Sequence, residues 1–150
     1  MPTSQLDRID QNIVDALSKD GRLSVSSLAK QVGLSKTPVQ ARLRRLEKEG
    51  FIRGYTAIID RERMGEGHIA FVQVTLSDTR SVALAEFNKA IMEIPEIDQC
   101  HMIAANFDYL LKVRTRDISS YRRILGERIS TLPYVSHTST FVAMETVKDR

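Results

Sequence analysis

The sequence predicts an α+β fold in two parts, three short helices followed by a segment in which strands and helices alternate. Apolar residues recur at helical spacing as far as residue 46, and from residue 69 runs rich in β-branched residues alternate with helical patterns. A polar, glycine-bearing stretch at 61–67 (RERMGEG) separates the two patterns. We expect a first domain at 1–54, a linker strand and hinge at 55–66, and a second domain at 67–150.

The charge is distributed unevenly between these parts. Residues 1–54 carry ten Lys and Arg against six Asp and Glu, whereas residues 55–150 carry twelve against thirteen. The hydrophobic share of 42% is normal for a globular protein, so the imbalance belongs to a folded domain. A basic first third joined to a nearly neutral remainder predicts a nucleic-acid-binding module followed by a domain with another role.

The chain carries few signals of export or membrane insertion. Cys100 is the single cysteine, so no disulfide can form within the chain, which fits a reducing compartment. No apolar run approaches the roughly 20 residues of a membrane helix. The first ten residues, MPTSQLDRID, lack the apolar core of a signal peptide. We therefore expect a cytoplasmic protein that does not associate with membranes.

The first two helices are predicted from apolar spacing and from residues that start or stop helices. One apolar face consists of Ile9, Ile13, Val14 and Leu17. Asp7 and Asp10 favour its start, and Gly21 is expected as a left-handed stop. Ser24 then caps a second helix, and Gly33 provides the turn after it. The inner face of this second helix consists of Leu28, Ala29 and Val32.

A third helix begins at Ser35, a good N-cap residue, with Pro38 in its first turn. Its packing face consists of Val39, Leu43 and Leu46. Because successive side chains turn by about 100° along a helix, a second set of residues faces away from the core. This outward set consists of Thr37, Ala41 and Arg44, flanked by Gln40 and Arg45.

The two helices around Gly33 lie in a basic window without acidic residues. Residues 21–46 contain six Lys or Arg and no Asp or Glu. The outward side chains suit DNA, since Arg binds phosphate or guanine, Gln binds adenine and Ala contacts the thymine methyl group. The exposed N–H groups at the Ser35 end can hold a phosphate. The alternative is a solvated basic face on an ordinary three-helix bundle, but such a surface would intersperse acidic residues.

After the third helix the sequence predicts a wing. Residues 51–55 read as the start of a β-wing, with Arg53 close to the DNA backbone. Residues 55–60 (YTAIID) read as an extended linker strand. The first domain is thus expected to be a winged helix-turn-helix.

The second part is predicted as a ferredoxin-like βαββαβ domain. Strands are expected at 69–76, 97–105, 109–115 and 135–147, and helices at 81–93 and from Asp117 or Ser119 to Pro133. A tight turn at 106–108 joins the two middle strands. Right-handed crossovers place both helices on one face of the sheet. The other face stays open and is expected to pack against a second copy of the chain.

No catalytic or metal-binding constellation is visible. His68, His101 and His137 have no metal-ligand spacing with one another or with Cys100. There is no nucleophile–base set and no phosphate-binding glycine loop. We expect neither an enzyme nor a cofactor. Two alternatives remain, an enzyme built on a ferredoxin-like fold and an architectural protein that compacts DNA without sequence preference.

Three segments carry a resemblance to a known family. They are LDRIDQNIVDAL (6–17), DGRLSVSSLAKQVGLSKTPVQARLRRLEKEGFIRGYTAIID (20–60) and CHMIAANFDYLLKV (100–113). In this order they resemble signatures of the Lrp/AsnC family, the bacterial leucine-responsive and asparagine-responsive (feast/famine) regulators. The resemblance implies a winged helix-turn-helix that binds promoter DNA and a ferredoxin-like sensor domain that dimerises through its sheet. It also implies assembly of dimers into octamers on the nucleoid, with an amino-acid effector bound between dimers.

The outward helix face and the resemblance together predict the DNA-contacting residues. They are Ser35, Lys36, Thr37, Pro38, Gln40, Ala41, Arg44, Arg45 and Arg53. The resemblance places the effector at the turn between the second and third sensor strands, with a contribution from the last strand. The matching residues are Ala105, Asn106, Phe107 and Asp108, with Thr138 and Thr140.

The effector turn departs from the family pattern. Ala105 stands where the family usually has glycine, and Asn106 stands where an acidic residue is common. If Ala105 has a positive φ, the backbone cost is about 1 kcal/mol. Asp108 can pair with the effector's ammonium group, or it can simply stabilise the turn. A different effector, a weaker response and an altered position all remain open.

The resemblance leaves the biological assignment open as well. Control of amino-acid metabolism genes is implied, by leucine, proline or another amino acid. Global control of the leucine type and control of proline or branched-chain catabolism are both compatible with the residues. Activation and repression are equally compatible.

Overall fold

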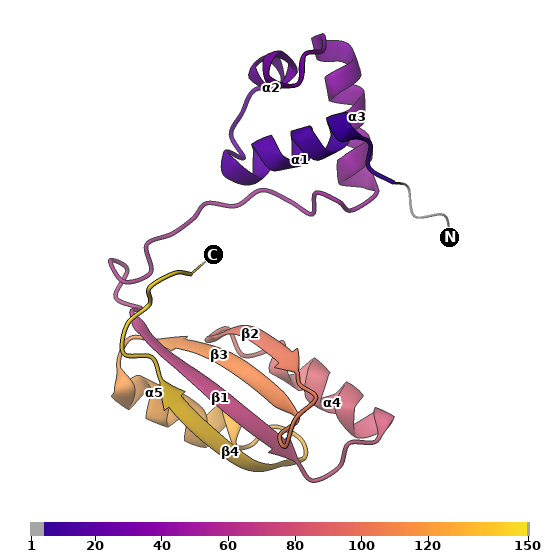
Figure 1. Ribbon diagram of the computed structural model, residues 1–150. Coiled ribbons are helices and arrows are strands. Elements are labelled where there is room, and N and C mark those ends of the chain that lie inside the picture. Colours follow the sequence, from indigo (N-terminus) through magenta and orange to yellow (C-terminus); the bar gives the residue numbers. More distant parts are fainter. Residues whose placement is uncertain (1–4, 150) are drawn as a thin grey trace. The chain divides into compact units, whose positions relative to one another are not determined.

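The computed structural model describes residues 5–149 (Figure 1). The contacts between residues divide the chain after Ile58 into two compact units, and each unit is described by itself. Among the described residues, no helix has both the length and the apolar character that crossing a bilayer requires.

The first unit contains three helices, α1 (Arg8–Lys19), α2 (Val25–Val32) and α3 (Lys36–Lys48). Its core consists of Ile13, Leu28, Ala29, Val32, Val39 and Leu46. The α2–α3 turn follows from Gly33, whose φ of 73° lies in the left-handed region that favours glycine. Asp7 caps α1 by accepting a hydrogen bond from the backbone N–H of Asp10. The predicted helix-turn-helix is confirmed.

Two predicted helix ends differ from the structure. Helix α1 ends at Lys19. Its C-cap residue Asp20 is extended and donates its N–H to the Ala16 carbonyl, so Gly21 is not a left-handed stop. Ser35 occupies the N-cap position of α3, but its side chain makes no capping hydrogen bond. The start of α2 is different, because there the Ser24 hydroxyl accepts the Ser27 N–H at 3.1 Å.

The predicted wing strand at 51–55 and linker strand at 55–60 are wrong as regular structure. Both segments are irregular, because a strand needs a neighbouring strand to satisfy its backbone groups and the described residues offer none here. The chain instead reverses at Gly50, with φ of 81°, and the N–H of Ile52 donates to the Leu46 carbonyl. The Tyr55 hydroxyl donates to Glu47 at 2.8 Å, which holds the segment against α3.

The second unit is a four-stranded antiparallel sheet with helices on one face (Figure 1). The strands are β1 (His68–Leu76), β2 (Ile97–Met102), β3 (Tyr109–Thr115) and β4 (Val135–Val142), in the order β2-β3-β1-β4. The helices are α4 (Ser81–Ile91) and α5 (Ile118–Ile124), the latter continuing as a π-helix, η1 (Leu125–Ile129). The predicted βαββαβ fold is confirmed.

The core of the second unit lies between the sheet and the helices. Val72 of β1 lies opposite Leu111 of β3, and both are fully buried. Phe87 of α4 packs on Tyr109, with ring centroids 4.4 Å apart. Residues that alternate with these point to the other face, where Phe71 lies between Phe141 and Lys112. This second face is called the open sheet face below.

Strands β2 and β4 end earlier than the sequence predicted. Strand β4 stops at Val142, opposite Ala70 near the start of β1, and not at residue 147. Strand β2 stops at Met102, opposite the first residue of β3, and not at residue 105. Helix α4 ends at Ile91 and not at 93, and the second helix becomes a π-helix at Leu125. Periodicity alone marks none of these limits.

Candidate nucleic-acid interface and effector turn

The outward face of α3 carries most of the residues predicted to meet DNA. Val39 and Leu46 are fully buried against α1 and α2, which turns the opposite side of α3 toward solvent. The exposed residues of this side are Lys36, Thr37, Pro38, Gln40, Ala41 and Arg44. They offer an amide, a hydroxyl, a methyl group and two cationic groups on one surface. Groups of these kinds bind base edges and phosphates.

The first turn of α3 adds a second anion-binding feature. The helix has no acidic residue in this turn, and Ser35 makes no side-chain cap to its N–H groups. The N–H groups at a helix start have no partner within the helix and carry a partial positive charge. Ser35 and Lys36 are both exposed here. This end of α3 can therefore receive a phosphate oxygen.

Arg45, expected at the edge of the reading face, is held by α1. Its Nη2 lies 2.5 Å from Oδ2 of Asp10, and Asp10 is 1% exposed. Arg42 binds the other oxygen of the same carboxylate at 2.9 Å and reaches Asp7 at 2.6 Å. Two of the three arginines of α3 therefore contribute to packing between α1 and α3.

These ion pairs also set the charge of the two carboxylates. Burial acts to raise the pKa of Asp10, but hydrogen bonds from Arg45 and Arg42 outweigh it, so this pKa lies below the ordinary value. The pKa of Asp7 is also lowered, first by the backbone N–H of Asp10 and then by Arg42. Both groups are ionised at neutral pH, so each arginine has a full counter-charge.

The sequence contained a signal for this cluster that the helix-start interpretation missed. Asp10 lies one position from Ile9 and three from Ile13, within the apolar stripe of α1. A carboxylate in such a stripe is buried, and a buried charge needs a partner. The basic residues of α3 were the available partners.

Arg53 is not on α3. It follows the reversal at Gly50 and lines a hollow of about 280 Å³ together with Val14 and Leu17 of α1 and Phe51. The structure thus groups this predicted DNA contact with α1 and the segment after α3.

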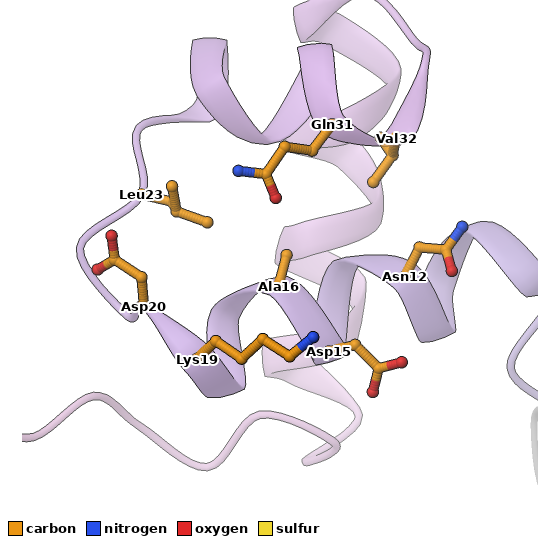
Figure 2. A pocket seen from close by; sticks show the side chains of 8 residues that line it. All are labelled: Asn12, Asp15, Ala16, Lys19, Asp20, Leu23, Gln31 and Val32. Carbon is orange, nitrogen blue, oxygen red and sulfur yellow. The ribbon is translucent and has the colours of Figure 1, made fainter.

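A second hollow, of about 450 Å³, lies between α1, α2 and the loop that joins them (Figure 2). It is lined by Asn12, Asp15, Ala16, Lys19, Asp20, Leu23, Gln31 and Val32. Its charged side chains come from two places, Asp15 and Lys19 on α1 and Asp20 at the start of the loop (Figure 2). No group of three or more His, Cys, Asp or Glu side chains suited to a metal ion occurs among residues 5–149.

The predicted effector turn is a six-residue loop at 103–108. It is closed by the N–H of Ile103, which donates to the Asp108 carbonyl at 2.9 Å. The Asp108 carboxylate accepts the N–H of Leu76 at 2.7 Å, and its own N–H donates to Val74 at 2.9 Å. This carboxylate ties the loop to the end of β1, as expected for a turn-stabilising residue.

The condition for backbone strain at Ala105 is not met. Among the described residues, Tyr134 is the single non-glycine residue with a positive φ. Ala105 and Asn106 are exposed and Phe107 is half-buried, all with negative φ. A six-residue loop reverses the chain without a left-handed residue at this point, so alanine carries no backbone cost here.

The two threonines of β4 face the helix side of the sheet. Thr138 lies opposite Val74, and Thr140 lies opposite Val72. The Asp108 N–H donates to the Val74 carbonyl from the other side of β1. Strand β1 therefore lies between Thr138 and the turn. The Thr140 hydroxyl is hydrogen-bonded to that of Tyr121, which is buried in the helix layer.

Two features of the second unit were absent from the sequence predictions. Lys112 and Arg114 lie on the open sheet face and pair with Asp149 near the C-terminus; the Arg114–Asp149 distance is 3.1 Å. Arg114 also binds Asp98 at 2.8 Å.

Burial raises the pKa of the Cys100 thiol to about 11, so this thiol stays protonated at neutral pH.

Known proteins resemble the chain over nearly its whole length. The proline dehydrogenase transcriptional activator of Rhizobium radiobacter is 59% identical over 147 residues, covering 98% of this chain and 94% of the relative. The leucine-responsive regulatory protein of Escherichia coli (strain K12) is 47% identical over 147 residues, covering 98% and 90%. A Neisseria meningitidis transcriptional regulator solved as a complex with L-Met has a TM-score of 0.89 at 26% identity, covering 97% and 94%.

The two units match separate families. Residues 6–53 match the winged helix-turn-helix DNA-binding domain, and residues 69–150 match the Lrp/AsnC ligand binding domain. These are domains of transcription regulators and not of enzymes. With both domains in this order and a 59% identical relative over the same length, the chain belongs to the Lrp/AsnC family of transcription regulators.

Proposed function

We propose that this regulator reads promoter DNA with the outward face of α3 and answers to L-proline bound in the second unit. The observation that carries the DNA part is the division of α3 into a buried face and an exposed basic face. The contacts proposed are Ser35, Lys36, Thr37, Pro38, Gln40, Ala41 and Arg44, with Arg53 nearer the DNA backbone. Arg45, also predicted as a contact, is left out because it is bound by Asp10. The division of roles follows from helix geometry and from the ion pairs of Arg45.

The choice of proline rests on the relatives. The 59% identical relative is named for activation of proline dehydrogenase, whereas the leucine-responsive protein is 47% identical. A related regulator binds L-Met, which supports a free amino acid as the class of effector. Leucine is the second candidate. The target that we propose is a gene for proline catabolism. The regulator would act on this gene in the cytoplasm, at the nucleoid.

The effector site proposed is the loop of Ala105, Asn106, Phe107 and Asp108, with Thr138 as its neighbour across β1 and Thr140 farther along β4. The exposed loop can offer backbone N–H groups and the Asn106 amide to a carboxylate. Since the Asp108 carboxylate already accepts the Leu76 N–H, its remaining lone pairs are what an ammonium group would meet. A partner subunit completes this shallow site in the assembly that we propose.

The assembly proposed is a dimer through the open sheet faces, with dimers joining into an octamer. Phe71 and Phe141 pair across β1 and β4, and 37% and 53% of their respective surfaces are exposed. Adjacent exposed aromatic side chains on a flat sheet are suited to a self-complementary interface. Two joined helix-turn-helix units would then meet two half-sites of one promoter.

The test measures binding of the full-length protein to the DNA upstream of a proline dehydrogenase gene, by fluorescence anisotropy at fixed salt. L-Proline at millimolar concentration is expected to change this affinity about fivefold or more, the range of ordinary allosteric coupling. L-Leucine serves as the comparison. A response to leucine alone would reassign the effector, and equal affinity with every amino acid would remove the sensing role.

A thermal-shift series with the twenty amino acids tests the effector site independently. An amino acid that binds the folded protein raises its melting temperature. Ala105→Gly restores the usual family residue and gives a ligand more room. We expect this variant to increase the proline-induced shift, and no shift with any amino acid in either protein would contradict the site.

A further inference from the structure

Asp10 is a buried carboxylate that binds two arginines of α3 and accepts the backbone N–H of Asp7 at the start of its own helix. It is 1% exposed, yet it lies on α1 within a bundle whose other buried side chains are apolar. Each of its carboxylate oxygens binds one guanidinium of α3, Oδ1 that of Arg42 and Oδ2 that of Arg45. A doubly paired buried carboxylate fixes the directions of both long side chains.

The pairs divide the arginines of α3 into two kinds. Arg42 and Arg45 are three residues apart, so they lie on the same side of the helix, the side facing α1. Arg44 lies about 100° from Arg45 around the axis and is exposed. Of the three neighbouring arginines, Arg42, Arg44 and Arg45, two are therefore paired with carboxylates in the folded protein.

We propose that Asp10 is a positioning residue for DNA recognition, which holds Arg42 and Arg45 against α1 and leaves Arg44 as the arginine of this cluster that reads base edges. This inference rests on the proposed entry of α3 into the DNA groove. Free guanidinium groups bind phosphates of any sequence, and so raise affinity without specificity. By holding two of them against α1, where Asp7 supplies the second negative charge, Asp10 keeps the contribution of the base contacts dominant.

The experiment compares four full-length proteins: wild type, Asp10→Asn, the double variant Asp10→Asn/Arg45→Gln, and the control Asp15→Asn. Asp15 is exposed on the same helix, so its variant makes the same change in net charge. The probes are a duplex that the wild type selects from a random pool and a shuffled duplex of equal composition. Affinities for both are measured over a range of salt concentrations, and circular dichroism confirms folding.

In Asp10→Asn we expect the preference for the selected duplex to fall about tenfold. The slope of log affinity for shuffled DNA against log salt should steepen by about 1, which corresponds to one additional phosphate contact. The double variant removes a released guanidinium and should return the slope to that of the wild type. Asp15→Asn should keep the wild-type preference.

Equal behaviour of Asp10→Asn and Asp15→Asn would overturn the inference, because only net charge would then matter. A fall in affinity for both duplexes in proportion, with an unchanged slope, would show that Asp10 is merely structural. Failure of the wild type to select any sequence would refute the proposed function itself, which is a different outcome.

Arg45→Gln alone keeps the inference testable if Asp10→Asn does not fold. The Asp10 carboxylate then keeps Arg42, and the variant loses no base contact. We expect its preference for the selected duplex to fall by less than about fivefold, below the loss caused by removing a base-reading arginine. A loss as large as that of Arg44→Ala would make Arg45 a reader and overturn the inference.

Discussion

At the residue scale, position on the helix decides what an arginine does. Arg44 and Arg45 are adjacent in the sequence, but only Arg45 lies within reach of the Asp10 carboxylate, at 2.5 Å. Arg44 is exposed on the side opposite the buried face. The residue type fixes the chemistry that is available, and the direction of the side chain decides whether DNA or the protein receives it.

Replacement of Arg44 by alanine tests this assignment. We expect Arg44→Ala to lose about 1–3 kcal/mol of binding at the cognate site and to relax the base preference at one position. Fluorescence anisotropy with selected and singly substituted duplexes measures both effects. Lys19→Ala, at the far end of α1, is the matched loss of one positive charge. Specific binding that is unchanged in Arg44→Ala would mean that the reading face is misplaced.

Acid should weaken the first unit through Asp10. Its pKa is lowered in the folded protein from the ordinary value of 3.8, so the folded state binds the proton less tightly than the unfolded state. Its contribution to stability is therefore present above about pH 4 and is lost as the pH falls through the lowered pKa. Denaturant titrations between neutral pH and about pH 2 should show a smaller pH-dependent loss for Asp10→Asn than for wild type. Identical curves would contradict the role of the ion pairs.

At the element scale, elements held by local contacts were predicted from the sequence, and elements held by long-range contacts were not. The helices were predictable, because one apolar stripe and local caps such as Asp7 and Ser24 define them. The strand limits were not, because they depend on pairing with strands that are distant in the sequence: β2, for example, ends opposite Tyr109, the first residue of β3. The regular strands expected at 51–60 did not form, because the described residues offer them no neighbouring strand. The Asp10 cluster joins residues more than 30 positions apart, a contact that local patterns do not specify.

The effector turn provides a test of backbone conformation at this scale. Since Ala105 has a negative φ, Ala105→Gly should gain nothing in the folded state and should lose about 0.4–1 kcal/mol through the greater freedom of the unfolded chain. Gly33→Ala is the opposite case, because its φ of 73° disfavours alanine, and it should destabilise by about 1 kcal/mol or more. Thermal and denaturant unfolding measure both variants. A more stable Ala105→Gly protein would contradict the loop conformation.

At the scale of the whole molecule, the proposal is that two chains pair through their open sheet faces. A single helix-turn-helix makes few contacts, so pairing through the sheets is what would let two of them occupy one promoter. Lys112 and Arg114 on this face already have carboxylate partners, whereas Phe71 and Phe141 form an adjacent pair of exposed apolar side chains on it.

A charge placed in the aromatic pair should separate the protomers. We expect Phe71→Glu to shift the protein toward monomer and to reduce DNA affinity at least about tenfold, because half of the paired contacts are lost. Val82→Glu, on an exposed position of α4, is the matched control and should leave assembly unchanged. Sedimentation velocity measures the mass of both variants. A dimer that persists in Phe71→Glu would place the interface elsewhere.

Competition binding at fixed salt tests the central claim, that α3 gives this regulator sequence-specific recognition of DNA, most directly. Wild-type protein bound to a labelled duplex that it has selected is challenged with unlabelled selected duplex and with a shuffled duplex. The account predicts a preference for the selected duplex of about a thousandfold or more. A preference within about tenfold would contradict it and would instead identify an architectural protein that binds DNA without reading it.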